Sequence, residues 1–272
     1  MMTPKSRFAL ALAPVCMMYP LAAYIAVHAG DAVQSLDLKS DEFVKADMTR
    51  ANLETKIAAL KDGETLDLTG QRLNGLDLSG FDFRRTKLQS TRLNGANLKA
   101  ANFEGVMLDQ AWALRSDFTG ANFKGASLFA TQMMDATLEN ADFTGASVAA
   151  DMSRANLINA KFDHAKLAPD LKNQSMGLMR GVLNSAKLDG ASFKKANMLR
   201  ATLQFASLKN ADFEGANLAG SELAGADLTG ANIAGARFDK ADVNGAKLLS
   251  LKGKATATGL DAMFNADKAQ RD

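Results

Sequence analysis

The sequence predicts an all-β solenoid, a fold in which the chain winds in successive coils around one narrow core. The first observation is a period of five residues: Ala-Asn-Leu or Ala-Asn-Phe triplets, such as those at 96–98 and 101–103, recur along the chain. The second is a period of 20 residues, at which phenylalanines recur: Phe83, Phe103, Phe123 and Phe143. Neither an α-helix, with about 3.6 residues per turn, nor a strand, which alternates faces, produces either period.

A five-residue period indicates a chain that turns a corner in every repeat. We call the large apolar residue of each repeat, usually Leu or Phe, its centre; centres recur every five residues over 68–148, 152–167 and 178–248. The residue two positions earlier is usually Ala, and the residue two positions later is often Gly. We expect the centre and the small residue to point inward and the polar residue between them to point outward.

The repeats are irregular at two places. One residue is missing between Val148 and Met152, so the phenylalanine that continues the series lies at 162. The segment 168–177 contains Pro169, the single Pro after residue 29, and we expect it to be an irregular loop. The loop is interpreted as a packing accommodation, with a functional protrusion as the alternative.

The loop at 168–177 also affects the phase of the repeats. The centres on its two sides, Leu167 and Leu178, are further apart by one residue than two full repeats would place them. We expect this extra residue to offset the missing one. On this count Phe193 and Phe213, again 20 residues apart, lie on a different face from the earlier phenylalanines.

The triplets resemble those of the pentapeptide-repeat family, whose pattern is A(D/N)LXX. Further examples in this chain are Ala-Asp-Phe at 141–143 and 211–213 and Ala-Asp-Leu at 226–228. The resemblance implies a right-handed quadrilateral β-helix with four repeats per coil, which agrees with the independent 20-residue spacing of phenylalanines. About nine such coils would fill 66–252, and at about 4.8 Å per coil the rod would be about 40 Å long.

We expect a capping element at each end, because an open β-helix end would template aggregation. The segment 50–61 is predicted to be a helix, with Thr49 as N-cap and Gly63 as the residue that stops it. Its apolar face would consist of Leu53, Ile57 and Leu60. The residues 36–49 are left open, because Leu38, Phe43, Met48 and Leu53 could also form one more pentapeptide coil.

The sequence divides into four parts. Residues 1–29 form a leader, 30–65 an N-terminal segment with the capping helix, 66–252 the interrupted β-helix, and 253–272 a C-terminal cap or tail. Within the last part, 258–270 is predicted to be a short helix or a tail, and a helix would present three apolar residues: Leu260, Met263 and Phe264.

The leader has the pattern of a secretory signal peptide. Lys5 and Arg7 precede an apolar run, and Val27-His28-Ala29 supplies small residues at the cleavage positions. An uncleaved membrane anchor is the alternative; after removal no membrane span is expected. Both interpretations place the remainder outside the cytoplasm, in the periplasm, with the thylakoid lumen or secretion as alternatives.

Composition excludes several functions. The leader holds the single Cys and two of the 32 basic residues but no acid, so 30 basic and 30 acidic residues remain and their net charge is zero. We therefore expect no nucleic-acid binding, which needs a basic surplus. After residue 29 the chain has one histidine, His164, and no Cys, so we expect no metal, no cofactor and no enzymatic activity.

One outward column is a candidate partner contact. Arg72, Arg92 and Trp112 occupy the position just before a centre, 20 residues apart, and Trp112 is the single Trp of the chain. An exposed aromatic residue beside cations is typical of a binding patch or a cation–π stack. Alternatively Trp112 or Leu114 bends inward, because the neighbouring centre, Ala113, is undersized.

A secondary basic patch is predicted from Arg180 and Arg200, assigned to one column, with Lys195 nearby. The function expected from all these features is that of an exported, non-catalytic scaffold whose flat walls bind an unidentified protein. A homodimer joined through one end of the solenoid is a second assembly that the sequence allows. The alternative function, from the resemblance to gyrase-shielding quinolone-resistance proteins, is DNA mimicry, which the zero charge and the export signal disfavour.

Overall fold

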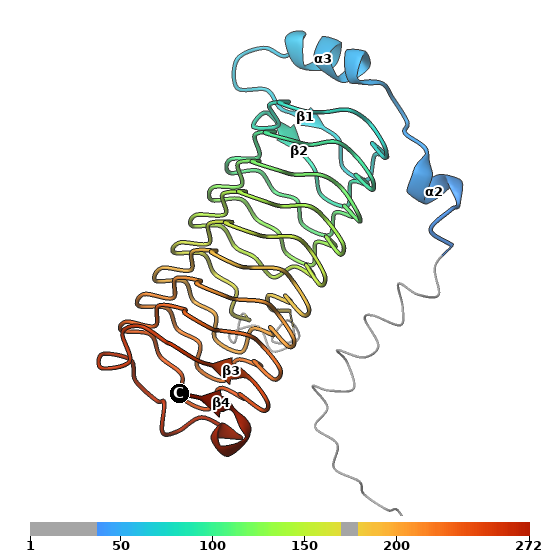
Figure 1. Ribbon diagram of the computed structural model, residues 1–272. Helices are drawn as coiled ribbons and strands as arrows, with labels where there is room; N and C mark the ends of the chain where they lie inside the picture. Colours follow the sequence, from blue (N-terminus) through green and yellow to red (C-terminus); the bar gives the residue numbers. More distant parts are fainter. Residues whose placement is uncertain (1–36, 170–178) are drawn as a thin grey trace, which may run out of the picture. The chain divides into compact units, whose positions relative to one another are not determined.

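The computed structural model describes residues 37–169 and 179–272 (Figure 1). The chain divides into two compact units, Met1–Asp37 and Leu38–Asp272, and the second contains all elements discussed below. The predicted leader and most of the predicted loop at 168–177 lie outside the described residues. Within the described ranges, no helix is both long and apolar enough to cross a membrane.

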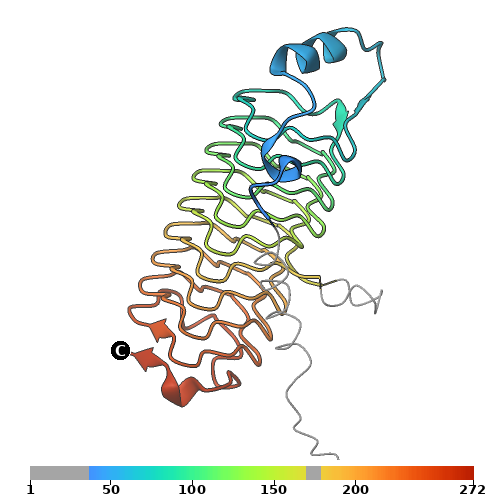
Figure 2. The same ribbon diagram turned by 90° about the vertical axis from the view of Figure 1, so that its right-hand side faces the viewer.

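The unit Leu38–Asp272 is a solenoid in which each repeat pairs with the equivalent repeat of the next coil (Figures 1 and 2). The outward residues form parallel bridges, as between Arg92 and Trp112 or between Asn97 and Asp117. Most bridges join a single residue of one coil to a single residue of the next, because the chain turns a corner after every repeat. Extended strands are therefore few and short: β1 (Leu66–Asp67) pairs with β2 (Thr86–Lys87), and β3 (Lys247–Leu248) with β4 (Gln270–Arg271).

The corners explain the frequent Gly two residues after each centre. This residue has a positive φ, for example 64° at Gly95 and 56° at Ser90, a region in which Gly is unstrained. The next residue closes the turn, since the N–H of Ala96 donates to the carbonyl of Leu93 at 3.1 Å. The polar outward residue stabilises the corner as well: the carboxylate of Asp142 accepts the N–H of Thr144 at 3.0 Å.

The core is a stack of large centres between small residues. Seven phenylalanine rings lie parallel, with centroids 4.7 to 5.1 Å apart and interplanar angles of 8° or less: Phe83, Phe103, Phe123, Phe143, Phe162, Phe193 and Phe213. All seven are fully buried. The prediction that Phe193 and Phe213 lie on another face is therefore wrong.

The loop between Leu167 and Gly181 explains this error. Lys161 pairs with Ser192, which lies further along the chain than the end of an ordinary coil, so the loop lengthens this coil without adding repeats. The N–H of Gly181 donates to the carbonyl of Leu167 at 2.8 Å, as the residue three after a centre does elsewhere. Gly is needed there because a Cβ would lie 2.9 Å from that of Leu167. Leu178, counted as a centre, lies outside the described residues.

The N-terminal part of the unit contains two helices. Helix α3 (Arg50–Ala58) begins at Thr49, whose side chain accepts the N–H of Asn52 while the Asn52 side chain accepts that of Thr49. The predicted N-cap is confirmed, but the helix ends at Ala59, and Gly63 lies in the following turn. Helix α2 (Asp41–Val44) precedes it in 36–49, the segment left open by the sequence.

The C-terminal segment is not an α-helix over 258–270, in contrast to one of the two predictions. It pairs with the preceding coil, Thr258 with Arg237 and Phe264 with Asp242, before the short 3-10 helix η2 (Ala266–Lys268) and β4. Both pairings span slightly more of the chain than those of the preceding coils. The last coil is therefore slightly longer than the coils directly before it.

Candidate functional site

The column that contains Arg72, Arg92 and Trp112 lies on one wall of the solenoid, as the sequence predicts. Parallel bridges join Arg72 to Arg92 and Arg92 to Trp112, so the coils fix the spacing of the three side chains. Trp112 is half-buried, and Leu114 is buried beside the undersized centre Ala113. The indole contacts Phe43, from the N-terminal part of the unit, and Arg92, from its own wall.

We call the covering segment, residues 38–45, the strap. The ring of Phe43 meets the indole of Trp112 edge-on, with centroids 5.6 Å apart and an angle of 67°. The guanidinium carbon of Arg92 lies 5.0 Å from the centre of the Phe43 ring and 5.6 Å from that of Trp112. Phe43 is 7% exposed. A cation between two aromatic rings is a favourable cation–π arrangement. One of the two rings, that of Phe43, belongs to the strap.

Charged groups of the N-terminal segment pair with the same column. The Arg92 side chain forms an ion pair with Glu42, although its Nη1 atom is buried without a hydrogen-bond partner among the described residues. After the strap, Ala46 pairs antiparallel with Leu73, and the Asp47 N–H donates to the carbonyl of Arg72 at 2.7 Å. We call this contact the anchor.

The anchor is reinforced by side chains. The Nε of Arg72 donates to the Asp47 carboxylate at 2.8 Å, and the backbone N–H of Arg72 donates to it at 2.7 Å. These hydrogen bonds from Arg72 hold the pKa of Asp47 below its ordinary value of 3.8. The carboxylate therefore stays charged throughout the neutral range, and these hydrogen bonds join it to Arg72 and not to the strap.

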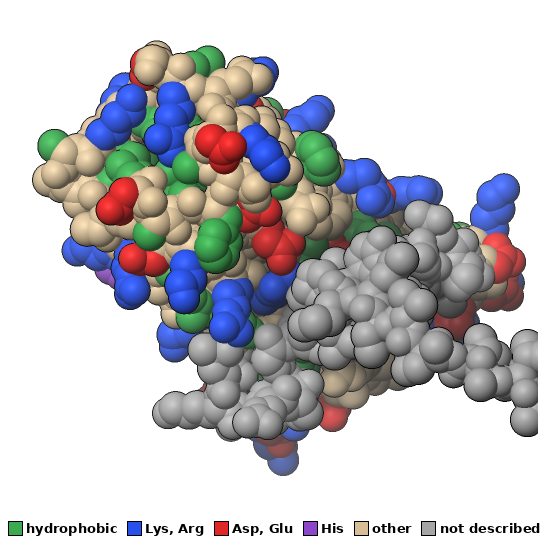
Figure 3. All heavy atoms as spheres, turned by 90° about the horizontal axis from the view of Figure 1, so that it is seen from below, with side chains coloured by type: hydrophobic (Ala, Val, Ile, Leu, Met, Phe, Trp, Pro, Cys, Tyr) green, Lys and Arg blue, Asp and Glu red, His purple; other side chains and the backbone are tan. Residues whose placement is uncertain are grey.

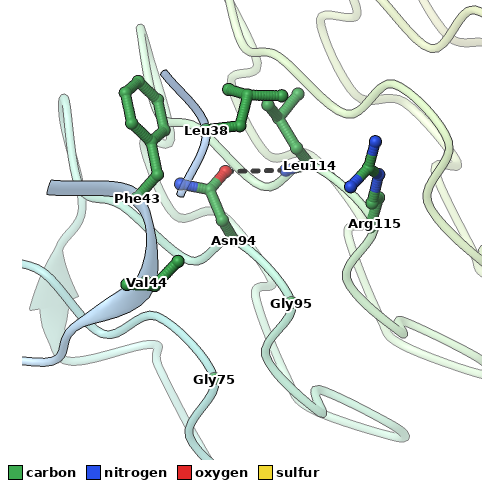
Figure 4. Close-up of a pocket in the computed structure, with 8 residues that line it drawn as sticks. All are labelled: Leu38, Phe43, Val44, Gly75, Asn94, Gly95, Leu114 and Arg115. Carbon is green, nitrogen blue, oxygen red and sulfur yellow. Dashed lines mark hydrogen bonds between the residues drawn. The ribbon is translucent and has the colours of Figure 1, made fainter. Parts of the chain in front are cut away.

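Two buried asparagines lie under the strap, one of them bonded to it directly, and the sequence analysis missed both. The amide of Asn74 donates to the carbonyls of Glu42 at 3.0 Å and Lys45 at 2.9 Å. Its oxygen accepts the N–H of Asn94, whose own side-chain oxygen accepts the N–H of Leu114 at 2.9 Å (Figure 4). The signal was present: the tripeptide Leu-Asn-Gly occurs twice, 20 residues apart.

A hollow of about 270 Å³ remains between the strap and the wall (Figure 4). It is lined by eight residues: Leu38, Phe43, Val44, Gly75, Asn94, Gly95, Leu114 and Arg115. Val44 is 51% exposed, so the strap fills this side of the wall incompletely.

The secondary basic patch is predicted from Arg180, Lys195 and Arg200, and these side chains differ in exposure. Val182 pairs with Thr202, so the 20-residue register places Arg180 in phase with Arg200. The Arg180 side chain is 15% exposed and forms an ion pair with Glu222 at 2.8 Å. Lys195 and Arg200 are exposed at two successive corners.

The remaining described surface is polar and charge-balanced. Figure 3 shows basic and acidic side chains interspersed on one end of the molecule. Ion pairs cross the coils, as between Lys124 and Asp142 or between Lys194 and Asp212. Within 37–169 and 179–272, no group of three or more His, Cys, Asp or Glu residues could hold a metal ion.

Comparison of the sequence with models of known protein families identifies the family of this chain. The model described as "Pentapeptide repeats" matches the chain in 8 copies, over residues 67–99, 96–132, 114–148, 131–168, 182–215 and 211–248. The chain belongs to the pentapeptide-repeat family. The matched segments leave out the residues between 168 and 182, the point at which the register of the described repeats changes.

Solved structures of other pentapeptide-repeat proteins are similar to this one. HetL, involved in heterocyst differentiation regulation in the cyanobacterium Nostoc sp. strain PCC 7120, matches with a TM-score of 0.56 and 26% identity, over 82% of this chain and 94% of that chain. The plasmid-mediated fluoroquinolone resistance protein QnrB1 matches with a TM-score of 0.43 and 16% identity, over 78% and 92%. The solenoid is accordingly a right-handed β-helix.

A third structure is a pentapeptide repeat protein from the thylakoid lumen of Arabidopsis thaliana, with a TM-score of 0.13 and 28% identity over 50% of this chain and 70% of that chain. Among curated protein sequences, none matched the chain. Pentapeptide-repeat proteins are generally non-catalytic structural or interaction proteins.

Proposed function

We propose that this pentapeptide-repeat protein is an exported, non-catalytic scaffold that binds another protein on the walls of its solenoid. The observation that carries the proposal is the parallel register of outward side chains, which pair from coil to coil along each wall. Such a register holds polar and aromatic groups at fixed spacings without a folding cost on binding. We further propose about nine four-sided coils, closed by α3 at one end and by the C-terminal segment at the other.

Export is supported by the sequence of the leader, 1–29. The predicted cleavage after Ala29 would release a chain that begins at Gly30 in the periplasm, with the thylakoid lumen or secretion as the alternative destination. The test is mass spectrometry of the N-terminus of protein recovered from the native cells. A peptide that begins at Gly30 supports export, and a retained Met1 in the membrane fraction contradicts it.

The binding proposal is tested by crosslinking from each wall. Asn122, Ser127, Gln132 and Thr137 are outward residues of four successive repeats, so each lies on a different side of one coil. A photo-crosslinking residue at each position, in four separate variants expressed in the native cells, should give adducts with another polypeptide mainly at one position. If none of the four yields an adduct, the chain is not a wall-binding scaffold.

The alternative function is protection or inhibition of a nucleic-acid enzyme by DNA mimicry. Such a mimic needs a continuous acidic surface, whereas the aspartates at 117, 142 and 227 each pair with a lysine. We therefore expect that the purified chain neither binds duplex DNA at low salt nor inhibits gyrase in a supercoiling assay. Protection of gyrase at micromolar protein would reverse this ranking.

A further inference from the structure

We propose that the wall under the strap is a binding site for an acidic peptide segment that carries an aromatic residue next to a carboxylate. The strap occupies this site until such a partner displaces it. This inference rests on the proposed scaffold function and deepens it, because it names the wall and the chemistry of the partner.

The strap itself shows which chemistry the wall accepts. Glu42 supplies the carboxylate that pairs with Arg92, and the adjacent Phe43 supplies the ring that packs against Arg92 and Trp112. Asn74 then holds two backbone carbonyls of the strap. The wall therefore offers a cation, an aromatic face and an amide donor, and none of the three requires that the ligand be part of the same chain.

The strap has features of a replaceable ligand. Its helix α2 is four residues long, and the N-cap residue Ser40 makes no side-chain hydrogen bond to it. Helices of this length do not form without tertiary contacts. The Glu42 carboxylate is 55% exposed, and the ion pair between Asp41 and Lys45 is exposed on both sides. Exposed pairs of this kind contribute little, so the strap is held mainly by Phe43 and by the hydrogen bonds from Asn74.

The wall also has groups that the strap leaves unused. The hollow beside Val44 is unfilled, and Arg115, which lines it, forms no ion pair within the described part of the chain. A partner with a larger apolar residue after the aromatic one, and with a second carboxylate nearby, would make contacts that the strap does not make. Such a partner would bind the wall more tightly than the strap.

Displacement would leave the solenoid intact. The anchor, Ala46 and Asp47, pairs with the first coil through its backbone. The Asp47 carboxylate pairs with Arg72. None of these hydrogen bonds, nor the ion pair, involves Arg92 or Trp112. Residues 38–45 can therefore leave the wall while the anchor continues to cover the edge of the first coil.

The test uses the full chain and a blocked peptide with the sequence of residues 37–46. Fluorescence reports on the site directly, because Trp112 is the single Trp. We expect the peptide to bind the Phe43→Ala chain saturably, to shift the Trp112 emission and to reduce quenching by acrylamide, a neutral quencher. The wild-type chain should bind the peptide about tenfold more weakly, since its own strap competes.

Matched variants make the result specific. A peptide with Val44→Leu should bind more tightly than the native peptide, and a scrambled peptide of the same composition should not bind. Glu42→Gln is a second chain with a weakened strap, and Phe205→Ala, which removes an exposed ring elsewhere, should behave like the wild type. Equal binding of the scrambled peptide, or no saturable binding by either weakened chain, overturns the proposal.

The peptide test and the crosslinking test fail separately. If the peptide does not bind but adducts form at another wall, the scaffold function stands and this site is wrong. If the peptide binds but no wall gives an adduct in the native cells, the chemistry of the wall stands and the scaffold function is wrong.

Discussion

The ring of Phe162 stacks on that of Phe193 at 4.9 Å, although the loop before Gly181 separates the two residues in the sequence. The stack is continuous because Gly181 takes the place directly after the corner that begins at Leu167. The core therefore contains one continuous column of rings from Phe83 to Phe213.

Stacking predicts a large effect of truncation in the middle of this column. Phe123→Ala should lower the free energy of unfolding by about 3–5 kcal/mol, because it removes a fully buried ring between two parallel neighbours. Denaturant titration measures this loss. The matched control, Phe205→Ala, removes a 68% exposed ring and should change stability by about 0.5 kcal/mol or less. A small loss for Phe123→Ala would mean that the ring is not in the core.

The asparagine pair predicts a polar contribution under the strap. Asn94→Ala should destabilise the chain by about 1–3 kcal/mol, because it leaves the buried N–H of Leu114 without its acceptor. Asn184→Ala is the matched control: Asn184 lies one residue after a centre too, but accepts a part-buried N–H, that of Gln204. Equal losses for the two variants in urea titrations would contradict a special role for the buried pair.

The corner carboxylates predict acid sensitivity. Hydrogen bonds from Arg84 lower the pKa of Asp82, whereas burial raises that of Asp142 but is outweighed by hydrogen bonds from Thr144 and the charge of Lys124. Both groups have folded-state pKa values below the ordinary 3.8, so they stabilise the fold fully above that pH. Their contribution is lost as the pH falls through the lowered values.

Substitution of these aspartates by Asn tests the prediction. Asn102 and Asn122 occupy the same column and already accept the N–H two residues later, so Asn fits these corners. The double variant Asp82→Asn with Asp142→Asn should be less stable than the wild type at pH 7, because the charged contribution is missing, and should show a weaker loss of stability between about pH 4 and pH 2. Urea midpoints across that range give the answer. An unchanged acid slope would show that these carboxylates titrate alike in the folded and unfolded states.

Helix α3 provides a fourth prediction. Thr49→Ala removes the side-chain acceptor of the capping box and should destabilise the helix by about 1 kcal/mol. Hydrogen exchange at the backbone N–H of Leu53, which donates to the Thr49 carbonyl, should become faster. The control is Thr55→Ala, whose hydroxyl donates to a carbonyl inside the helix and caps nothing. If the Leu53 N–H exchanges at the same rate in both variants, the capping box does not stabilise the first turn of α3.

Much of the fold could be predicted because the repeat leaves its period in the sequence. The five-residue spacing located the centres, the spacing of the phenylalanines gave the 20-residue coil, and Thr49 marked the start of a helix. The phase after Leu167 could not be predicted by counting, because a loop of any length is compatible with the solenoid when its two ends meet. Only the contact between Gly181 and Leu167 fixes where the repeats resume.

The candidate site could be predicted in part. Its wall residues followed from the 20-residue columns, but the strap did not, because residues 38–45 have no periodicity that would direct them to Trp112. Their docking depends on a few side chains, chiefly Phe43 on Arg92, and such contacts leave no repeating signal. The ion pair of Arg180 with Glu222 was likewise not predicted, because it depends on two particular side chains and not on the repeat.

The contact between Gly181 and Leu167 has a consequence for how such a chain can evolve. Each coil touches only its neighbours, and the winding resumes wherever a chain end returns to the carbonyl of a centre. Unequal duplication or loss of 20-residue units could therefore lengthen or shorten the rod without disturbing either end. Foreign sequence inserted between these two residues would leave the winding unchanged as long as the contact between Gly181 and Leu167 formed, which makes this point a natural entry for a new segment.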